Sequence, residues 1–227
     1  VYPNSGNFNV TLIVISDSGC TDTIVQPVNV YSLPIPNFNN TTVCLNDFTG
    51  FSDASTVAGG SIVSWSWDFG DGTGTSTNQD PLYVYSNDGF YNATLTVISG
   101  NGCYSDTIAK QIEVYPLPTA NFIAGIVCKG MPTIFTDSSY SDIVSWNWDF
   151  GDGNTDTVNQ NPSHIYENNG NFNVALAVED GNGCSQSIIN QVLVTPSPTA
   201  NFSIEPQSTT VLNPTITFAN SSSGAVL

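Results

Sequence analysis

Apolar and polar residues alternate along short stretches of this chain, and the most regular stretch occurs twice. Residues 62–72 read Ile-Val-Ser-Trp-Ser-Trp-Asp-Phe-Gly-Asp-Gly, and residues 143–153 repeat this pattern 81 positions later. Successive side chains of a strand point to opposite faces, so Trp65, Trp67 and Phe69 share one face. The corresponding residues of the second copy are Trp146, Trp148 and Phe150. Buried aromatic clusters contribute much of a small domain's core, so we expect one such core per copy.

Other alternating stretches predict several short strands on either side of each tryptophan segment. In the first full repeat, we expect strands near 37–39, 47–52, 61–69, 82–86, 90–98 and 105–114. In the second, we expect them near 121–123, 132–137, 143–150, 163–166, 171–179 and 187–194. Val10, Leu12 and Val14 also alternate with their neighbours, as in a half-buried strand. Short strands separated by turn residues, without an amphipathic helix, are typical of a β-sandwich.

Proline-containing junctions divide the chain into repeats of about 80 residues. They lie at 33–36, 117–118 and 197–198, and each precedes a phenylalanine that opens a new unit. Because proline fixes φ and removes a donor, each junction should be short and stiff. The predicted units are the end of a repeat at 1–33, full repeats at 34–117 and 118–197, and the start of another at 198–227. We expect the chain to be a piece of a longer protein, because it starts in the middle of the repeat pattern.

The large excess of acidic residues argues against anionic partners. Two basic residues stand against nineteen acidic ones, which gives a formal net charge of −17. Binding to nucleic acid or to an anionic membrane surface needs clusters of Lys and Arg, so neither partner is expected. No apolar run approaches the roughly 20 residues of a membrane helix, so no membrane insertion is expected.

The repeated motif resembles the PKD (polycystic kidney disease) domain, an immunoglobulin-like β-sandwich. The resemblance covers the W-x-W-D-F-G-D-G segment, the Asn78–Pro81 segment, Tyr85 and Gly89. The second copy matches through the Asn159–Pro162 segment, Tyr166 and Gly170. It implies an all-β fold in which tandem immunoglobulin-like sandwiches form an elongated array. The cysteine-containing variant also resembles repeats of very large secreted surface proteins, the adhesins of gliding-type Bacteroidota, which use type 9 secretion.

This resemblance implies disulfide bonds within each repeat. Each full repeat has one early and one late cysteine, and in an immunoglobulin-like sandwich both places can lie at the same end. We therefore expect bridges Cys44–Cys103 and Cys128–Cys184, and a partner for Cys20 before Val1. Each bridge would stabilise its repeat by roughly 4 kcal/mol. Unpaired buried thiols are the alternative, and zinc is not expected because four ligands do not come together in the sequence.

Aspartates in and around the D-F-G-D-G motif have a structural and a chemical interpretation. Asp68, Asp71, Asp149 and Asp152 resemble the paired carboxylates of glycosidases, but Gly-Asp-Gly segments favour turns in which aspartate accepts backbone N–H groups. We expect that role for Asp71 and Asp152, and no catalytic residue. A calcium ion needs six to eight oxygens, which loop carboxylates can supply in part. The calcium candidates are Asp53, Asp71, Asp80, Asp137 and Asp152.

Three Asp-Thr-aliphatic triplets resemble the O-glycosylation acceptor pattern of Bacteroidota. Their threonines are Thr23, Thr107 and Thr157. Threonine is also common in strands, which is the alternative explanation. The single histidine, His164, is expected to be a strand-surface or loop residue.

The function expected from these features is structural. Non-catalytic spacer repeats of an extracellular adhesin or filament would hold a distal functional region away from the cell, in a gliding-related setting if the narrower resemblance holds. The partners would be neighbouring PKD-like repeats of the same chain. The alternative is a glycan- or protein-binding module of a secreted multidomain protein, which exposed aromatic side chains would favour. Neither interpretation needs a cofactor.

Overall fold

In the computed structural model, residues 1–212 and 215–224 are described, and the chain divides into two compact units, Val1–Pro116 and Leu117–Leu227. The described residues form strands, turns and loops, as expected for an all-β fold, and none of them is helical. Consequently, they contain no helix able to cross a membrane. Part of the predicted 198–227 unit, namely 213–214 and 225–227, lies outside the described residues.

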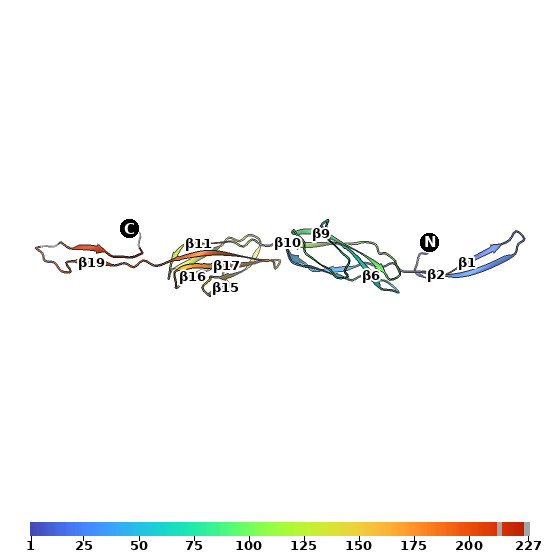
Figure 1. The fold of residues 1–227 in the computed structure, drawn as a ribbon, viewed down its shortest axis with the longest axis horizontal. Coiled ribbons are helices and arrows are strands. Elements are labelled where there is room, and N and C mark those ends of the chain that lie inside the picture. Colours follow the sequence, from blue (N-terminus) through green and yellow to red (C-terminus); the bar gives the residue numbers. More distant parts are fainter. Residues whose placement is uncertain (213–214, 225–227) are drawn as a thin grey trace. The chain divides into compact units, whose positions relative to one another are not determined.

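The first unit contains a separate hairpin followed by a two-layered sandwich (Figure 1). Its strands are β1 (Gly6–Ile15), β2 (Thr21–Val30), β3 (Phe38–Asn40), β4 (Val43–Cys44), β5 (Thr49–Asp53), β6 (Ile62–Asp68), β7 (Thr75–Ser76), β8 (Leu82–Tyr83), β9 (Gly89–Ser99) and β10 (Ile108–Tyr115). One sheet of the sandwich has the order β4-β10-β9-β6-β7 and the other the order β3-β5-β8. Neighbouring strands are antiparallel except β4, which runs parallel to the end of β10.

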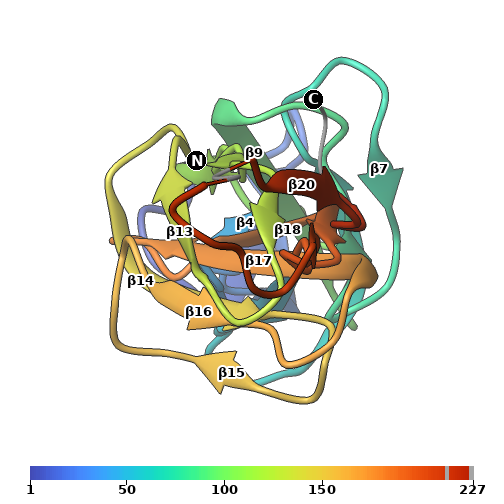
Figure 2. The ribbon, with the colours of Figure 1, turned by 90° about the vertical axis from the view of Figure 1, so that its left-hand side faces the viewer.

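The second unit repeats this sandwich and ends in a short hairpin. Its strands are β11 (Phe122–Ala124), β12 (Val127–Cys128), β13 (Pro132–Asp137), β14 (Ile143–Asp149), β15 (Thr155–Asp156), β16 (Ser163–Ile165), β17 (Gly170–Asp180), β18 (Ser185–Thr195), β19 (Phe202–Glu205) and β20 (Thr217–Asn220). The sheets have the orders β12-β18-β17-β14-β15 and β11-β13-β16. The long strands β17 and β18 lie side by side (Figure 2).

Each sandwich closes around a tryptophan from its central motif. Trp67 is 1% exposed, and its ring lies 5.1 Å from that of Phe38 and 5.5 Å from that of Phe51. Trp148 is fully buried and makes the same two aromatic contacts at 5.2 and 5.5 Å. Facing residues of β9 and β17 complete the two separate cores. The alternation in the sequence therefore correctly predicts one aromatic core for each repeat.

The expectation of half-burial is wrong for the hairpin β1–β2. Val10, Leu12 and Val14 are between 44% and 59% exposed. Strands β1 and β2 pair only with each other among the described residues, so no second sheet covers these side chains. The apolar pattern is the one that lies buried in β9, but burial depends on the opposite layer as much as on the pattern.

Candidate functional site

The turn after each tryptophan strand depends on one glycine and two carboxylates. Gly70 has φ 82°, and a Cβ placed there would lie 2.4 Å from the backbone oxygen of Asn92. A larger residue therefore faces both an unfavourable φ and a backbone clash. The Asp68 carboxylate accepts the Gly70 N–H at 2.8 Å, and the Asp71 carboxylate accepts the Gly74 N–H at 2.7 Å. Asp71 has the predicted turn-forming role, and Asp68 shares it.

Asp71 also binds a tyrosine hydroxyl twelve residues further on. The Tyr83 hydroxyl donates to Asp71, and the Tyr83 ring stacks on Phe69 with a centroid distance of 4.2 Å. The hydrogen bond from Tyr83, with the backbone N–H donors of the turn, lowers the pKa of Asp71 to about 2. The same bond raises the pKa of Tyr83, because it stabilises the neutral phenol beside the carboxylate. This aspartate is thus held ionised by its own repeat.

In the second repeat, a histidine takes the place of this tyrosine. His164 Nε2 lies 2.7 Å from Asp152 Oδ2, and its ring stacks on Phe150 with a centroid distance of 4.2 Å and an interplanar angle of 3°. Burial acts to raise the pKa of Asp152, but the hydrogen bonds from His164 and Asn154 outweigh it and hold that pKa below its ordinary value. We call this pair and the Asp71–Tyr83 pair the turn clamps. His164 belongs to a clamp, so the expectation of a simple surface or loop residue is incomplete.

A second aspartate of each repeat holds the outer tryptophan. Asp53 accepts the Trp65 indole N–H at 2.8 Å, and Asp137 accepts the Trp146 indole N–H at 2.8 Å. Burial acts to raise the pKa of Asp137, but hydrogen bonds from Ser139, Gln160 and Trp146 lower it overall. Both outer tryptophans are half-buried against their cores. Their indoles therefore serve the sandwich rather than form open aromatic platforms.

The five calcium candidates do not converge on one place. Asp80 accepts the backbone N–H of Asp53 at 2.8 Å, while Asp71 belongs to the separate turn clamp. Within residues 1–212 and 215–224, no group of three or more His, Cys, Asp or Glu side chains is arranged to hold a metal ion. Asp71 and Asp137 each accept several N–H or O–H donors of their own repeat, and calcium binding stays a prediction.

The predicted intra-repeat disulfides are wrong. Cys103 and Cys128 have free thiols, as does Cys20, whereas Cys44 and Cys184 are disulfide-bonded residues. The reason is the position of the early cysteine. Strand β4 pairs with the C-terminal end of β10, so Cys44 lies opposite Tyr115, and β12 likewise places Cys128 opposite Thr195.

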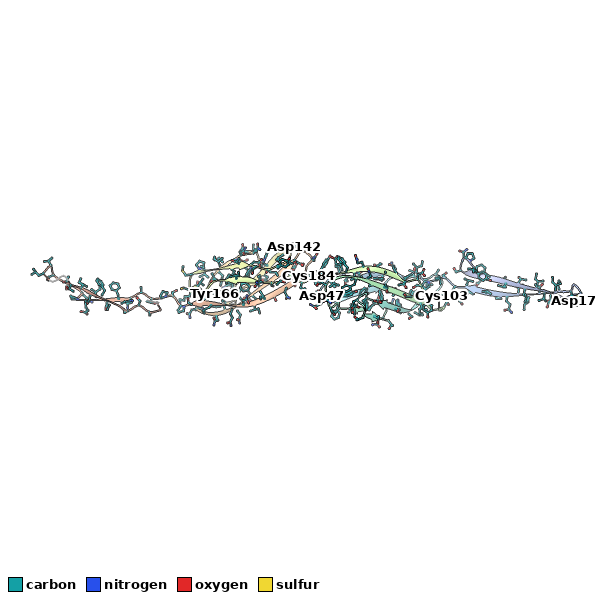
Figure 3. All side chains as sticks on the ribbon, turned by 90° about the horizontal axis from the view of Figure 1, so that it is seen from above. Asp17, Asp47, Cys103, Asp142, Tyr166 and Cys184 are labelled. Carbon is teal, nitrogen blue, oxygen red and sulfur yellow. The ribbon has the colours of Figure 1, made fainter. Side chains whose placement is uncertain are left out.

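The late cysteines lie in the turns at the other end of the same long strands. Figure 3 shows Cys103 at one end of the first repeat and Asp47, which donates its N–H to the Cys44 carbonyl, at the other. Strand β9 has eleven residues, so the end of the sheet that holds Cys44 lies roughly 30 Å from the turn that holds Cys103. A disulfide requires Cα atoms within about 7 Å, so Cys44 cannot reach Cys103. The same argument separates Cys128 from Cys184.

The threonines of the three Asp-Thr-aliphatic triplets are all exposed. Thr23 lies in β2, and Thr107 shares a hydrogen bond of 3.0 Å with Thr96. Thr157 lies in the loop after β15, where Asp156 accepts the backbone N–H groups of Val158 and Asn159. Their accessibility is compatible with modification, which stays a prediction.

The hollow beside β6 and β7 does not resemble a catalytic cleft. It has a volume of about 560 Å³ and is lined by Ser66, Trp67, Asp68 and residues 75–77. Its single carboxylate already accepts the Gly70 N–H. Sequence reasoning missed the clamp residues Tyr83 and His164, although their common spacing of twelve residues from Asp71 and Asp152 was available as a signal.

Comparison with known proteins gives a consistent family signal. The model of the PKD domain family matches residues 32–114 and again residues 116–195. Collagenase ColQ1 of Bacillus cereus is 42% identical over 81 residues, which cover 34% of this chain and 8% of that protein. The pre-pro-metalloprotease PrtV of Vibrio cholerae is 33% identical over 147 residues, which cover 62% of this chain and 15% of that protein. The chain therefore spans a small part of the length of these relatives.

Two solved PKD domains are also similar in sequence to part of this chain. The PKD1 domain of PrtV from Vibrio cholerae is 35% identical, with a TM-score of 0.34, and the match covers 37% of this chain and 98% of that domain. The PKD1 domain of Vibrio anguillarum Epp is 32% identical, with a TM-score of 0.33 and the same two coverages.

Proposed function

Because this chain belongs to the PKD domain family, we propose that its repeats are non-catalytic spacers of an extracellular multidomain protein. In this role they hold a distal functional region away from the cell surface. The observation that carries the proposal is that each repeat uses its polar and aromatic motif residues internally. Trp67 and Trp148 are buried, and the turn aspartates accept N–H groups of their own repeat. Each repeat therefore forms its motif contacts within itself, and the chain carries a net charge of −17.

The setting of a cell-surface adhesin or filament, exported by a type 9 route and linked to gliding, is the finer part of this proposal. It is supported by the cysteine-containing form of the repeat and by the exposed Asp-Thr-aliphatic triplets. Intact-mass measurement of the natural protein tests the second support. Extra mass that maps to Thr23, Thr107 or Thr157 favours this setting, and unmodified threonines at all three positions count against it.

A replacement experiment separates a spacer from a binding module. In the natural protein, residues 34–117 are either deleted or replaced by an unrelated sandwich of equal length. A spacer keeps its distal activity after replacement and loses part of it after deletion, because only length matters. A binding module loses activity equally in both variants, and that result would overturn the spacer proposal.

Exposed aromatic rings favour the second candidate, a glycan- or protein-binding module. Tyr104 is 66% exposed and Tyr140 is 82% exposed, whereas the indoles of Trp65 and Trp146 are held by Asp53 and Asp137. Aromatic side chains with one polar end are common in binding surfaces. Micromolar binding on a glycan array that is lost in Tyr140→Ala, but kept in the matched surface variant Val144→Ala, would establish this function.

A further inference from the structure

In the first repeat, a lysine bridges one open side of the sandwich. Strand β3 is the outer strand of its sheet, and β10 is the outer strand of the other sheet at Lys110, because β4 pairs with the last two residues of β10. The Lys110 ammonium donates to the Phe38 carbonyl on β3 and lies over the Phe38 ring, 5.0 Å from its centroid. This ammonium therefore has both a carbonyl acceptor and the face of an aromatic ring. The Phe38 side chain beneath it is fully buried.

The second repeat has the same arrangement of strands without the lysine. The strand registers place Asn190 of β18 at the position of Lys110, and Phe122 of β11 at the position of Phe38. Phe122 is 5% exposed, whereas Phe38 is fully covered. A hollow of about 380 Å³ lies here, and it is lined by Phe122, Ile123, Ala124, Asn190, Gln191 and Val192. We call it the lysine hollow, because in the first repeat Lys110 occupies the corresponding place.

We propose that the lysine hollow binds the side chain of a lysine residue from a partner protein. In the first repeat the chain provides this lysine itself, and in the second repeat the ring and the carbonyl are present while the ammonium comes from the partner. Charge complementarity favours such a partner, since the chain has two basic and nineteen acidic residues. The proposal does not rest on the spacer role, and a failure of either leaves the other standing.

The lining of the hollow suits both parts of a lysine side chain. Phe122, Ala124 and Val192 offer apolar surface along which the alkyl stem can lie. The face of the Phe122 ring attracts the ammonium, as the Phe38 ring does in the first repeat. The side-chain amide of Asn190 adds an oxygen acceptor and carries no charge that would repel a cation. A negatively charged or purely apolar ligand would leave part of this set unused.

The basic residue of the second repeat lies too far away to fill the hollow. Lys129 is exposed, and its backbone N–H donates to the carbonyl of Thr195. Thr195 is five residues beyond Asn190 on β18, which corresponds to roughly 17 Å along a strand. The Lys129 side chain is shorter than this separation. The lysine that enters the hollow therefore comes from outside the repeat.

A titration of the isotope-labelled chain of residues 1–227, followed by amide chemical shifts in NMR, tests the proposal. The probe is Nα-acetyl-lysine methylamide, and the control probe is Nα-acetyl-norleucine methylamide, which has a similar alkyl stem and no ammonium. We expect saturable shifts at Ile123 and Gln191 with millimolar affinity for the lysine probe, and roughly tenfold weaker binding of the norleucine probe. The absence of saturable shifts at these residues overturns the proposal, and so does equal binding of the two probes.

A substitution that fills the hollow gives the second measurement. Asn190→Lys places an ammonium where Lys110 has one, so the saturable shifts caused by the lysine probe should disappear. The matched control is Ile189→Lys, which adds the same charge at a neighbouring side chain that is 66% exposed and does not line the hollow. This control should bind the probe as the unaltered chain does. An unaltered far-ultraviolet circular dichroism spectrum shows that both variants fold, and a folded Asn190→Lys variant that still binds the probe overturns the proposal.

The reciprocal substitution should create a second site. Lys110→Asn removes the ammonium from the first repeat and opens the place that corresponds to the lysine hollow. The lysine probe should then cause new saturable shifts at Asn39 and Gln111, which correspond to Ile123 and Gln191. If this variant folds and shows no new shifts, the ring and the carbonyl do not suffice for binding and the proposal is overturned. If it does not fold, the titration of the unaltered chain and the Asn190→Lys variant decide.

Discussion

The two complete repeats share a core but differ in the clamp that closes the turn after the tryptophan strand. Trp67 and Trp148 meet equivalent phenylalanines at distances that agree within 0.1 Å. By contrast, the partner of the turn aspartate is a tyrosine in one repeat and a histidine in the other. Close packing allows few changes in the core, whereas a half-exposed clamp needs only a flat ring with a hydrogen-bonding edge. The two repeats therefore have the same aromatic core contacts, and they differ in the residue that pairs with the turn aspartate.

The largest expected effect tests whether the two cores are equivalent. Trp67→Ala and Trp148→Ala should each lower the free energy of unfolding of their own repeat by about 3–5 kcal/mol, because each leaves a large cavity. Hydrogen exchange at the amides of β9 and β17 reports on the two repeats separately. Val63→Ala and Val144→Ala are matched controls, since these valines lie on the same strands and are 56% and 59% exposed. A loss of protection that differs greatly between the two tryptophan variants would show that the cores are not equivalent.

The next effect concerns the glycine that both turns require. Gly70→Ala and Gly151→Ala should each cost roughly 2–3 kcal/mol, because φ is positive and a Cβ would meet a backbone oxygen at 2.4 or 2.5 Å. Gly72→Ala is the control, with φ 83° and no atom within 4 Å of the added Cβ. It should cost only about 1 kcal/mol. Urea unfolding of the three variants measures the difference, and equal costs for Gly70→Ala and Gly72→Ala would show that the clash is relieved by backbone movement.

The residues in these two predictions show which features of the fold can be predicted from the sequence and which cannot. The spacing of Trp67 and Phe69 predicts their burial because a strand's period of two is a local property. Trp65 has the same phase, yet it is only half-buried, with its indole N–H bound to Asp53. The two-residue strands β4 and β12 have no periodic pattern at all, and their pairing is decided by the tertiary structure. The disulfide prediction depended on that pairing, and so it was wrong.

Acid should weaken the first clamp in a defined direction. The pKa of Asp71 is lowered from 3.8 to about 2 in the folded protein, so the unfolded chain takes up a proton more readily as the pH falls. The stability from this carboxylate is fully present above pH 3.8 and is lost as the pH falls through about 2. Asp71→Asn should cost about 1–2 kcal/mol at pH 7, through weaker hydrogen bonds, and should flatten the acid dependence of the unfolding free energy. Asp17→Asn, in the exposed β1–β2 turn, is the control and should leave the free energy of unfolding at pH 7 unchanged.

The smallest effect asks whether the clamps can be exchanged. Tyr83 has room because Gly74 lies beneath it, and a Cβ at Gly74 would come within 2.4 Å of the tyrosine ring. Asn154 takes the place of Gly74 in the second repeat, since the Phe150 N–H donates to the Asn154 carbonyl as the Phe69 N–H donates to the Gly74 carbonyl. A tyrosine at position 164 would therefore crowd the side chain of Asn154.

We expect His164→Tyr alone to lower the unfolding free energy of the second repeat by about 1 kcal/mol through overpacking. Adding Asn154→Gly should restore part of that loss, which gives a coupling energy of about 1 kcal/mol in a double-mutant cycle measured by urea unfolding. The converse change, Tyr83→His in the first repeat, needs no second substitution, because a smaller ring above Gly74 meets nothing new. Additive effects of His164→Tyr and Asn154→Gly would mean that the two residues do not share space, and that the tyrosine and histidine clamps differ for a reason other than the glycine beneath the ring.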